Sequence, residues 1–194
     1  MKNKIFGIGL SRTGTNSLCY AMKGLGFKTK HFPINMQQIR NNDFNNDITV
    51  SGRFKELDKL FPNSKFIMTQ RNIDDWAVSC FNFFRRKNRN TKFNNWVLKS
   101  FKSIYNCGPE KVAKLSLENY KNQYIIFEKQ VRKYFSGRKN DILFINIIND
   151  NNPYTKLVSF LENNDLLNFP HKNIFKNNKK ADKSEKTFAI IVDK

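Results

Sequence analysis

The sequence predicts an α/β domain of three layers, in which helices cover both faces of a parallel sheet. Nearly continuous apolar segments alternate with segments of helical spacing along the chain, which is the pattern of parallel strands buried on both sides. The 194 residues, of which 39% are hydrophobic and 26% charged, are enough for one domain with its own core. This composition excludes collagen-like, low-complexity and disordered classes.

Short apolar runs bounded by Gly, Pro or Asn predict the strands, and apolar residues at helical spacing predict the helices. Gly26 ends the first helix, Pro33 ends the second strand, and Asp74 or Asp75 begins the helix after the third. The polar stretch at 37–46 is expected to be a loop or a frayed helix. In chain order, strands are expected at 5–10, 27–32, 65–70 and 141–148, and helices at 15–25, 54–61, from 74 or 75 onward, 92–105, 110–135 and 154–161.

A phosphate-binding loop is predicted between the first strand and the first helix. Gly9 and Gly14 have the GxxxxG spacing of a P-loop, in the strand–loop–helix context that such a match requires. Backbone amides of the loop and of the helix N-terminus can hold a phosphate there. A nucleoside triphosphatase needs Lys and then Ser or Thr after the second Gly, whereas this chain has Thr15 and Asn16 and carries its cation, Arg12, inside the loop.

A second anion site is predicted after the strand at 65–70. Arg71 follows the carboxyl end of that strand, and Ser79 lies eight residues later in the next helix. A guanidinium fork together with a hydroxyl suits a phosphate dianion. Because ligands of parallel sheets bind beyond the carboxyl ends of the strands, a ligand with two phosphate groups fits both sites.

With these motifs the sequence resembles the sulfotransferases that use 3′-phosphoadenosine-5′-phosphosulfate (PAPS). The resemblance covers about residues 4–173 and is carried by the segments 10–17, 57–69, 71–79, 141–146, 157–161 and 169–173. It implies a fold like that of the P-loop NTPases, PAPS as sulfuryl donor and no metal. It also implies a 5′-phosphosulfate loop formed by Ser11, Arg12, Thr13, Gly14, Thr15, Asn16 and Ser17, and a 3′-phosphate pair formed by Arg71 and Ser79.

The expected chemistry needs a cation at the leaving group and a base at the acceptor. Charge builds on the bridging oxygen of the donor as the sulfuryl group leaves, so Arg12 is the expected stabilising cation. His31, at the end of the second strand, titrates near neutral pH and is the first candidate for the base. Asp47 is the second candidate. Trp76 is expected to pack in the core rather than to stack on adenine.

The remaining expectations concern domains, partners and location. Residues 1–173 are expected to form the sulfotransferase-like domain and residues 174–194 a basic tail. The net charge of +19 indicates either an anionic partner or a coding bias toward Lys. Nucleic acid is an unlikely partner because no RNA- or DNA-binding motif is present. Small molecules, carbohydrates, lipids and proteins all stay open as acceptors, as does the oligomeric state.

Two other functions stay open at this point. One is a P-loop kinase acting on a nucleotide or a small molecule, and the other is a degenerate nucleotide-binding protein without catalysis. The three cysteines have no metal or disulfide spacing, and the apolar run at 5–10 is too short for a signal peptide or a membrane span. A cytoplasmic location is therefore expected.

Overall fold

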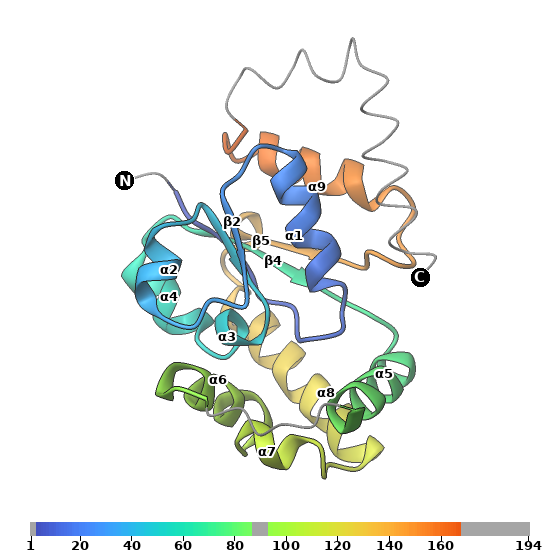
Figure 1. Cartoon of the computed structure of the whole chain (residues 1–194). Helices are drawn as coiled ribbons and strands as arrows, with labels where there is room; N and C mark the ends of the chain where they lie inside the picture. The colour runs from blue at the N-terminus through green and yellow to red at the C-terminus, as the bar shows by residue number, and fades with distance from the viewer. Residues whose placement is uncertain (1–2, 87–92, 168–194) are drawn as a thin grey trace.

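Five parallel strands form one sheet at the centre of the molecule (Figure 1). The computed structural model describes residues 3–86 and 93–167. The strand order is β2–β3–β1–β4–β5, so β1 has neighbours from both directions of the chain. The strands are β1 (Ile5–Gly7), β2 (Thr29–His31), β3 (Phe44–Asn46), β4 (Lys65–Thr69) and β5 (Ile142–Ile145). The expected boundary at residue 173 lies outside the described residues.

Alternate residues of the strands enter two separate hydrophobic clusters, one on each face of the sheet. Ile5 and Ile67 face the cluster that includes α1 (Thr15–Gly24) and α9 (Pro153–Glu162), whereas Phe6 and Phe66 face the larger cluster on the other side. This alternation is what the period of a strand requires when both faces are buried.

The larger cluster lies under the remaining helices of the described chain. It is built from α3 (Ile48–Ser51), α4 (Phe54–Leu60), α5 (Ile73–Arg86), α6 (Asn95–Tyr105), α7 (Pro109–Val112) and α8 (Leu117–Tyr134), with α2 (Met36–Arg40) at its margin. Figure 1 shows α1 and α9 on one side of the sheet and α5 to α8 on the other. The expected three-layer α/β fold is confirmed.

The polar stretch at 37–46 was wrongly expected to contain no strand. Residues 36–40 form α2, and Phe44–Asn46 form β3, which lies inside the sheet between β2 and β1. Two Asn residues hide this strand because Asn is rare in buried strands. Their side-chain amides are satisfied, since Asn45 Nδ2 donates to the Ile39 carbonyl at 3.1 Å and Asn46 Nδ2 to the Thr15 carbonyl at 2.6 Å.

The helix expected over 110–135 is two helices in the structure. α7 ends at Val112, and α8 starts at Leu117 after the cap residue Ser116. The Ser116 hydroxyl accepts from the backbone N–H of Asn119, and the Asn119 side chain accepts from the backbone N–H of Ser116. This reciprocal pair is a capping box, which fixes a helix start in the middle of the expected helix. None of the helices in the described ranges is long and apolar enough to cross a membrane.

Candidate active site

The predicted anion-binding residues meet where the chain changes direction across the sheet. The chain leaves β1 toward β2 on one side, whereas it leaves β4 toward β5 on the other. The crevice beyond the carboxyl ends of such strands is the usual ligand site of an open parallel sheet. The loop after β1 and Arg71 after β4 both lie at this edge.

Glycine is required at position 9 because the loop packs tightly against β4. A Cβ atom on Gly9 would lie 1.7 Å from Oγ1 of Thr69. The Thr69 hydroxyl is itself 2.6 Å from Oγ1 of Thr13, which donates to the Leu10 carbonyl at 2.7 Å. The backbone N–H of Thr13 also donates to Leu10. Thr13 therefore shapes the loop with both its hydroxyl and its amide.

The loop leaves the N-terminus of α1 open to a ligand. Gly14 precedes α1 with φ 95°, and no side chain caps the helix. The first amides of a helix have no carbonyl partner within it, and their dipoles attract anions. The amides of Thr15, Asn16 and Ser17 are of this kind. The side chains of Thr15 and Ser17 are buried, and that of Asn16 is exposed.

Arg12 and Arg71 link the two predicted anion sites into one. Arg12 has φ 74°, an uncommon conformation for a residue with a side chain. Its Nε donates to the Ser79 hydroxyl at 3.2 Å, and its guanidinium lies 4.9 Å from the centre of the Phe83 ring. A guanidinium N–H of Arg71 donates to the Arg12 carbonyl at 3.2 Å. The buried Nε of Arg71 has no hydrogen-bond partner among the described residues, so it remains available to an anion.

Trp76 and Tyr124 fix the two halves of this site relative to each other. Trp76 is fully buried, as expected, and its Nε1 donates to the Ser11 carbonyl at 2.9 Å. Its ring lies 4.9 Å from that of Tyr124. The Tyr124 hydroxyl accepts from the Arg71 N–H at 3.1 Å and is 3.2 Å from the Arg71 carbonyl, to which it donates. Burial raises the pKa of Tyr124, which keeps this donor protonated.

The two candidate bases contact each other. Nε2 of His31 lies 3.2 Å from Oδ2 of Asp47 and 3.2 Å from Oγ1 of Thr15. Oδ1 of Asp47 accepts from the Ser11 hydroxyl and from the Ile48 amide, each at 2.7 Å. Asp47 is 6% exposed and has φ 82°. His31 and Asp47 are therefore one unit, which is joined to the phosphate loop through Ser11.

Register explains why these residues, distant in sequence, come together. His31 at the end of β2 pairs with Asn46 at the end of β3, and Asn46 pairs with Gly7 at the end of β1. Asp47 directly follows Asn46. The missed strand β3 thus carries Asp47 between His31 and the phosphate loop, which no sequence pattern indicated.

The structure brings all the predicted site residues to this one edge of the sheet, in three groups. The phosphate loop contributes Ser11 to Ser17, the second anion site Arg71 and Ser79, and the base unit His31 and Asp47. Sequence reasoning missed Thr69, Phe83 and Tyr124. Thr69 and Tyr124 had no local signal, because their partners lie 56 and 53 residues away. In the described ranges no three His, Cys, Asp or Glu side chains are grouped so that they could hold a metal ion.

Comparison with known proteins agrees with this arrangement. The family model described as the sulfotransferase domain matches residues 4–53 and 39–177. This chain belongs to the sulfotransferase family. Among solved structures, its fold is similar to that of the mouse sulfotransferase SULT7A1 complexed with PAP, the 3′,5′-bisphosphate that remains of PAPS after transfer, with a TM-score of 0.51 and 13% sequence identity.

The likeness to the mouse sulfotransferase concerns the fold. It covers 97% of this chain but 64% of the mouse chain, so this member of the family spans less than two thirds of that relative's length. The comparison with curated protein sequences gave no match.

Proposed function

We propose that this sulfotransferase-family chain transfers a sulfuryl group from PAPS to a hydroxyl or amine acceptor. The observation that carries the proposal is the direct linkage of the two anion sites, in which Arg71 holds the backbone of Arg12 and Arg12 reaches Ser79. A donor with a 5′-phosphosulfate and a 3′-phosphate suits such a pair of adjoining sites. The mouse relative of similar fold was crystallised with PAP, which supports the same ligand class.

The donor is held by backbone amides and guanidinium groups. In this proposal the amides at the start of α1 bind the 5′-phosphosulfate, and Arg71 and Ser79 bind the 3′-phosphate. Ser11 and Thr13 act differently from the expectation, because their hydroxyls are bonded to Asp47 and to Leu10 within the protein. They position the loop, while Arg12 stabilises the charge that develops on the leaving group.

The acceptor is activated by the unit of His31 and Asp47. A carboxylate accepts hydrogen bonds, so Asp47 favours the tautomer of His31 that carries its proton on Nε2. Nδ1, which has no hydrogen-bond partner in the described part of the chain, then takes the acceptor's proton. As the acceptor oxygen or nitrogen bonds to sulfur, the bond from sulfur to the 5′-phosphate oxygen breaks and PAP leaves with the electron pair.

The kinase alternative predicts different ligands. A P-loop kinase holds the β- and γ-phosphates with Lys and its magnesium with Ser or Thr, where this chain has Thr15 and Asn16. We therefore expect PAP to raise the melting temperature without magnesium, whereas ATP with magnesium has little effect. At a PAP concentration 100 times the dissociation constant, the gain in stability is about 2.7 kcal/mol. Equal stabilisation by ATP with magnesium would contradict the proposal.

Turnover separates an enzyme from a protein that only binds the nucleotide. Transfer of labelled sulfate from PAPS to a panel of phenols, alcohols, amines and carbohydrates is the direct assay. We also propose a cytoplasmic location, because Cys19, Cys80 and Cys107 are all unpaired and such thiols are typical of a reducing compartment.

A further inference from the structure

One end of the molecule carries a cationic surface without neutralising acids. We call it the α5–α7 face and define it by the exposed residues Arg85, Arg86, Lys99, Lys102, Lys111 and Lys114. None of these six forms an ion pair with a described carboxylate, because the ion pairs of the described ranges all lie elsewhere. The sequence explains this, since it has no Asp or Glu between Trp76 and Pro109.

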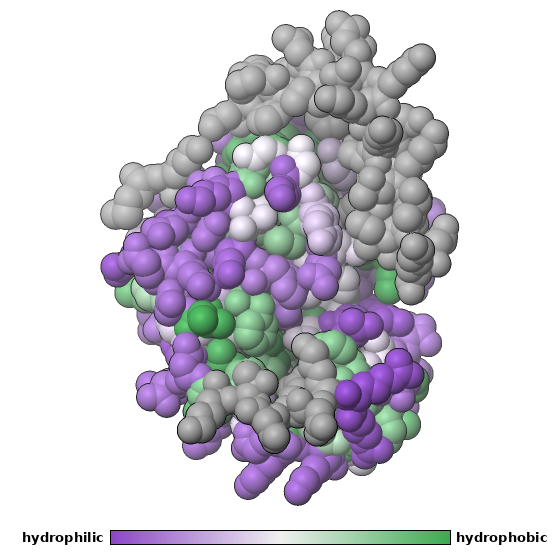
Figure 2. Space-filling model, in the orientation of Figure 1, coloured by the Kyte–Doolittle hydropathy of each residue, from purple (hydrophilic) through white to green (hydrophobic). Residues whose placement is uncertain are grey.

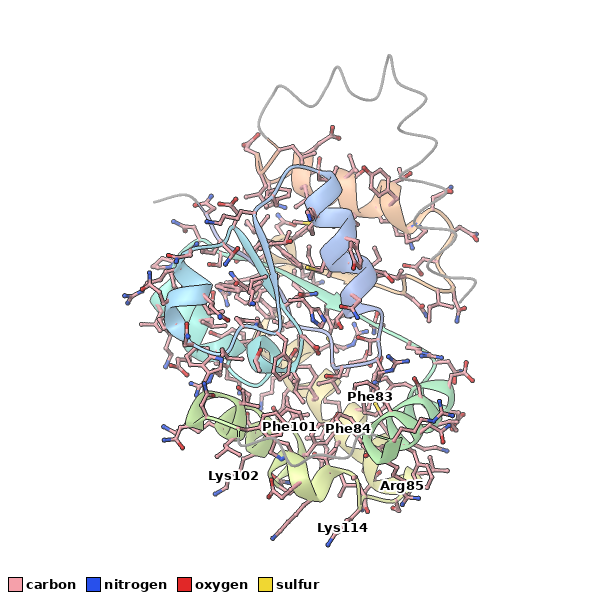
Figure 3. All side chains as sticks on the ribbon, in the orientation of Figure 1. Phe83, Phe84, Arg85, Phe101, Lys102 and Lys114 are labelled. Atoms are coloured by element: carbon pink, nitrogen blue, oxygen red, sulfur yellow. The ribbon has the colours of Figure 1, made fainter. Side chains whose placement is uncertain are left out.

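The α5–α7 face is continuous with the donor side of the active site. Helix α5 carries both Ser79, which contacts Arg12, and Arg85 on the face. At 1.5 Å per residue, these two positions are roughly 9 Å apart along the helix axis. Phe83, which lies against the Arg12 guanidinium, sits between them. Figure 3 shows Arg85 and Lys114 at the same end of the molecule, beyond Phe83.

The face also adjoins the side of the site that holds the base. Asn94, the cap of α6, donates to the carbonyl of Ile34, three residues after His31. Further along α6, the Ser100 hydroxyl donates to the carbonyl of Thr49, two residues after Asp47. Lys99 and Lys102 extend from this same helix. The two helices that carry the cations are therefore fixed to opposite sides of the proposed reaction centre.

Arg85 is held in place rather than free in solvent. Its Nε donates to the Ala113 carbonyl at 3.1 Å, and its guanidinium lies 3.4 Å from the centre of the Phe81 ring. Ala113 directly precedes Lys114, so two cations of the face are neighbours. An arginine fixed by stacking and by one hydrogen bond loses less conformational freedom when an anion binds.

The chemistry of the face decides between kinds of polyanion. The exposed large apolar side chains of the described residues lie elsewhere, with Val78 and Leu117 nearest in sequence, so the face lacks groups that insert into a membrane. It is also built from helices, whereas the edge strands that could pair with a peptide are β2 and β5. Hydrophilic side chains follow much of the lower margin of the molecule in Figure 2.

We propose that the α5–α7 face binds an acidic polysaccharide and that this polysaccharide is the sulfuryl acceptor. Such a chain has carboxylate or sulfate groups along its length for the six cations, and hydroxyl or amine groups for the reaction. This inference rests on the proposed sulfuryl transfer. Because the cations are exposed, their attraction is screened within about 8 Å at physiological salt, so binding weakens steeply as salt is added.

The test compares two triple variants that lose the same charge. The first is Lys99→Glu, Lys102→Glu and Lys114→Glu on the face, and the control is Lys23→Glu, Lys59→Glu and Lys129→Glu at exposed positions elsewhere. A labelled heparin oligosaccharide is the anionic probe and dextran the neutral one. We expect the full chain to bind heparin but not dextran, the face variant to bind about tenfold or more weakly, and the control to stay close to the wild type.

Three results overturn the proposal. Equal weakening in the control variant would mean that net charge alone attracts heparin. Binding of poly-glutamate, of RNA or of vesicles containing phosphatidylserine that is tighter than heparin binding, and that depends on the same three lysines, would assign the face to that partner. Failure of the wild type to bind heparin would also reject it.

The donor site gives an independent measurement. Both triple variants should keep the thermal shift with PAP and should keep sulfuryl transfer to a small phenol, while the face variant loses transfer to the polysaccharide. If the wild type binds heparin through the face but shows no thermal shift with PAP, the proposed function fails and the binding surface stands. If PAP binds and phenol is sulfated while the polysaccharide is not, the acceptor assignment fails alone.

Discussion

Asp47 performs two separable tasks, and two substitutions distinguish them. Its Oδ2 holds His31 Nε2 at 3.2 Å, whereas its Oδ1 accepts from the Ser11 hydroxyl and the Ile48 amide at 2.7 Å each. Asp47→Asn keeps an oxygen for Ser11 and Ile48 but turns an amide donor toward His31. Asp47→Ala removes all of these contacts. We expect the two variants to be similarly inactive but to differ in stability.

The magnitudes follow from these contacts. In Asp47→Ala, loss of the cap on α3 costs about 1 kcal/mol, and loss of the charge-assisted bond from the Ser11 hydroxyl costs about 1.5–3 kcal/mol. Together the free energy of unfolding falls by about 2–4 kcal/mol. In Asp47→Asn it changes by about 1 kcal/mol or less. The amide donor forces the proton of His31 onto Nδ1, so the general base is lost in both variants, and the rate falls by about 10²–10⁴-fold.

Urea unfolding measures the stability difference, and initial rates with labelled PAPS measure the catalytic loss. An alcohol acceptor of low acidity should show the full loss, whereas a phenol that is already partly ionised should recover much of it. PAP affinity should stay near the wild-type value in Asp47→Asn, because the donor loop remains bonded. An Asp47→Asn enzyme with wild-type turnover of the alcohol would refute the assignment of His31 and Asp47 as the base.

Four further predictions follow from the donor site and the buried phenols. Arg71→Ala should weaken PAP binding by about 10–150-fold, the equivalent of about 1.5–3 kcal/mol, but should leave binding of adenosine 5′-phosphosulfate almost unchanged in calorimetry, because only PAP has a 3′-phosphate. Arg12→Ala should lower the single-turnover rate by about 10²–10³-fold with every acceptor; a loss limited to one acceptor would place Arg12 on the acceptor instead. Tyr124→Phe should weaken PAP binding by about fivefold, since it frees the Arg71 backbone at a cost of about 1 kcal/mol, while the Trp76 contact keeps the fold; unchanged affinity would show that Tyr124 does not position Arg71. Burial raises the pKa of Tyr105, Tyr124 and Tyr134 above the ordinary value of 10.0, so absorbance at 295 nm should show their ionisation later than that of the exposed Tyr20. Because the unfolded chain loses these protons first, the stability that the phenols contribute is complete below pH 10 and is lost as the pH rises above it toward their raised values; a single titration step near pH 10 for all tyrosines of the native protein would contradict this.

Local sequence was enough to predict the layers of the fold and the two anion motifs. Apolar runs such as Ile5–Gly7 and the spacing of Gly9 and Gly14 are properties of short segments, and they depend on burial and backbone geometry that the segment itself largely dictates. Arg71 was found in the same way, because a polar residue after a buried strand lies at the ligand edge of a parallel sheet.

Only the tertiary structure could show what connects these segments. β3 was missed because the amides of Asn45 and Asn46 are satisfied by carbonyls of Ile39 and Thr15, so the cost of burying them is removed by partners that no local pattern contains. The same strand places Asp47 between His31 and Ser11, which turned two alternative bases into one unit. Sequence thus determines which residue types stand at the ends of the strands, whereas strand order and register decide which of them touch, because hydrogen bonds between distant segments form only once the sheet is assembled.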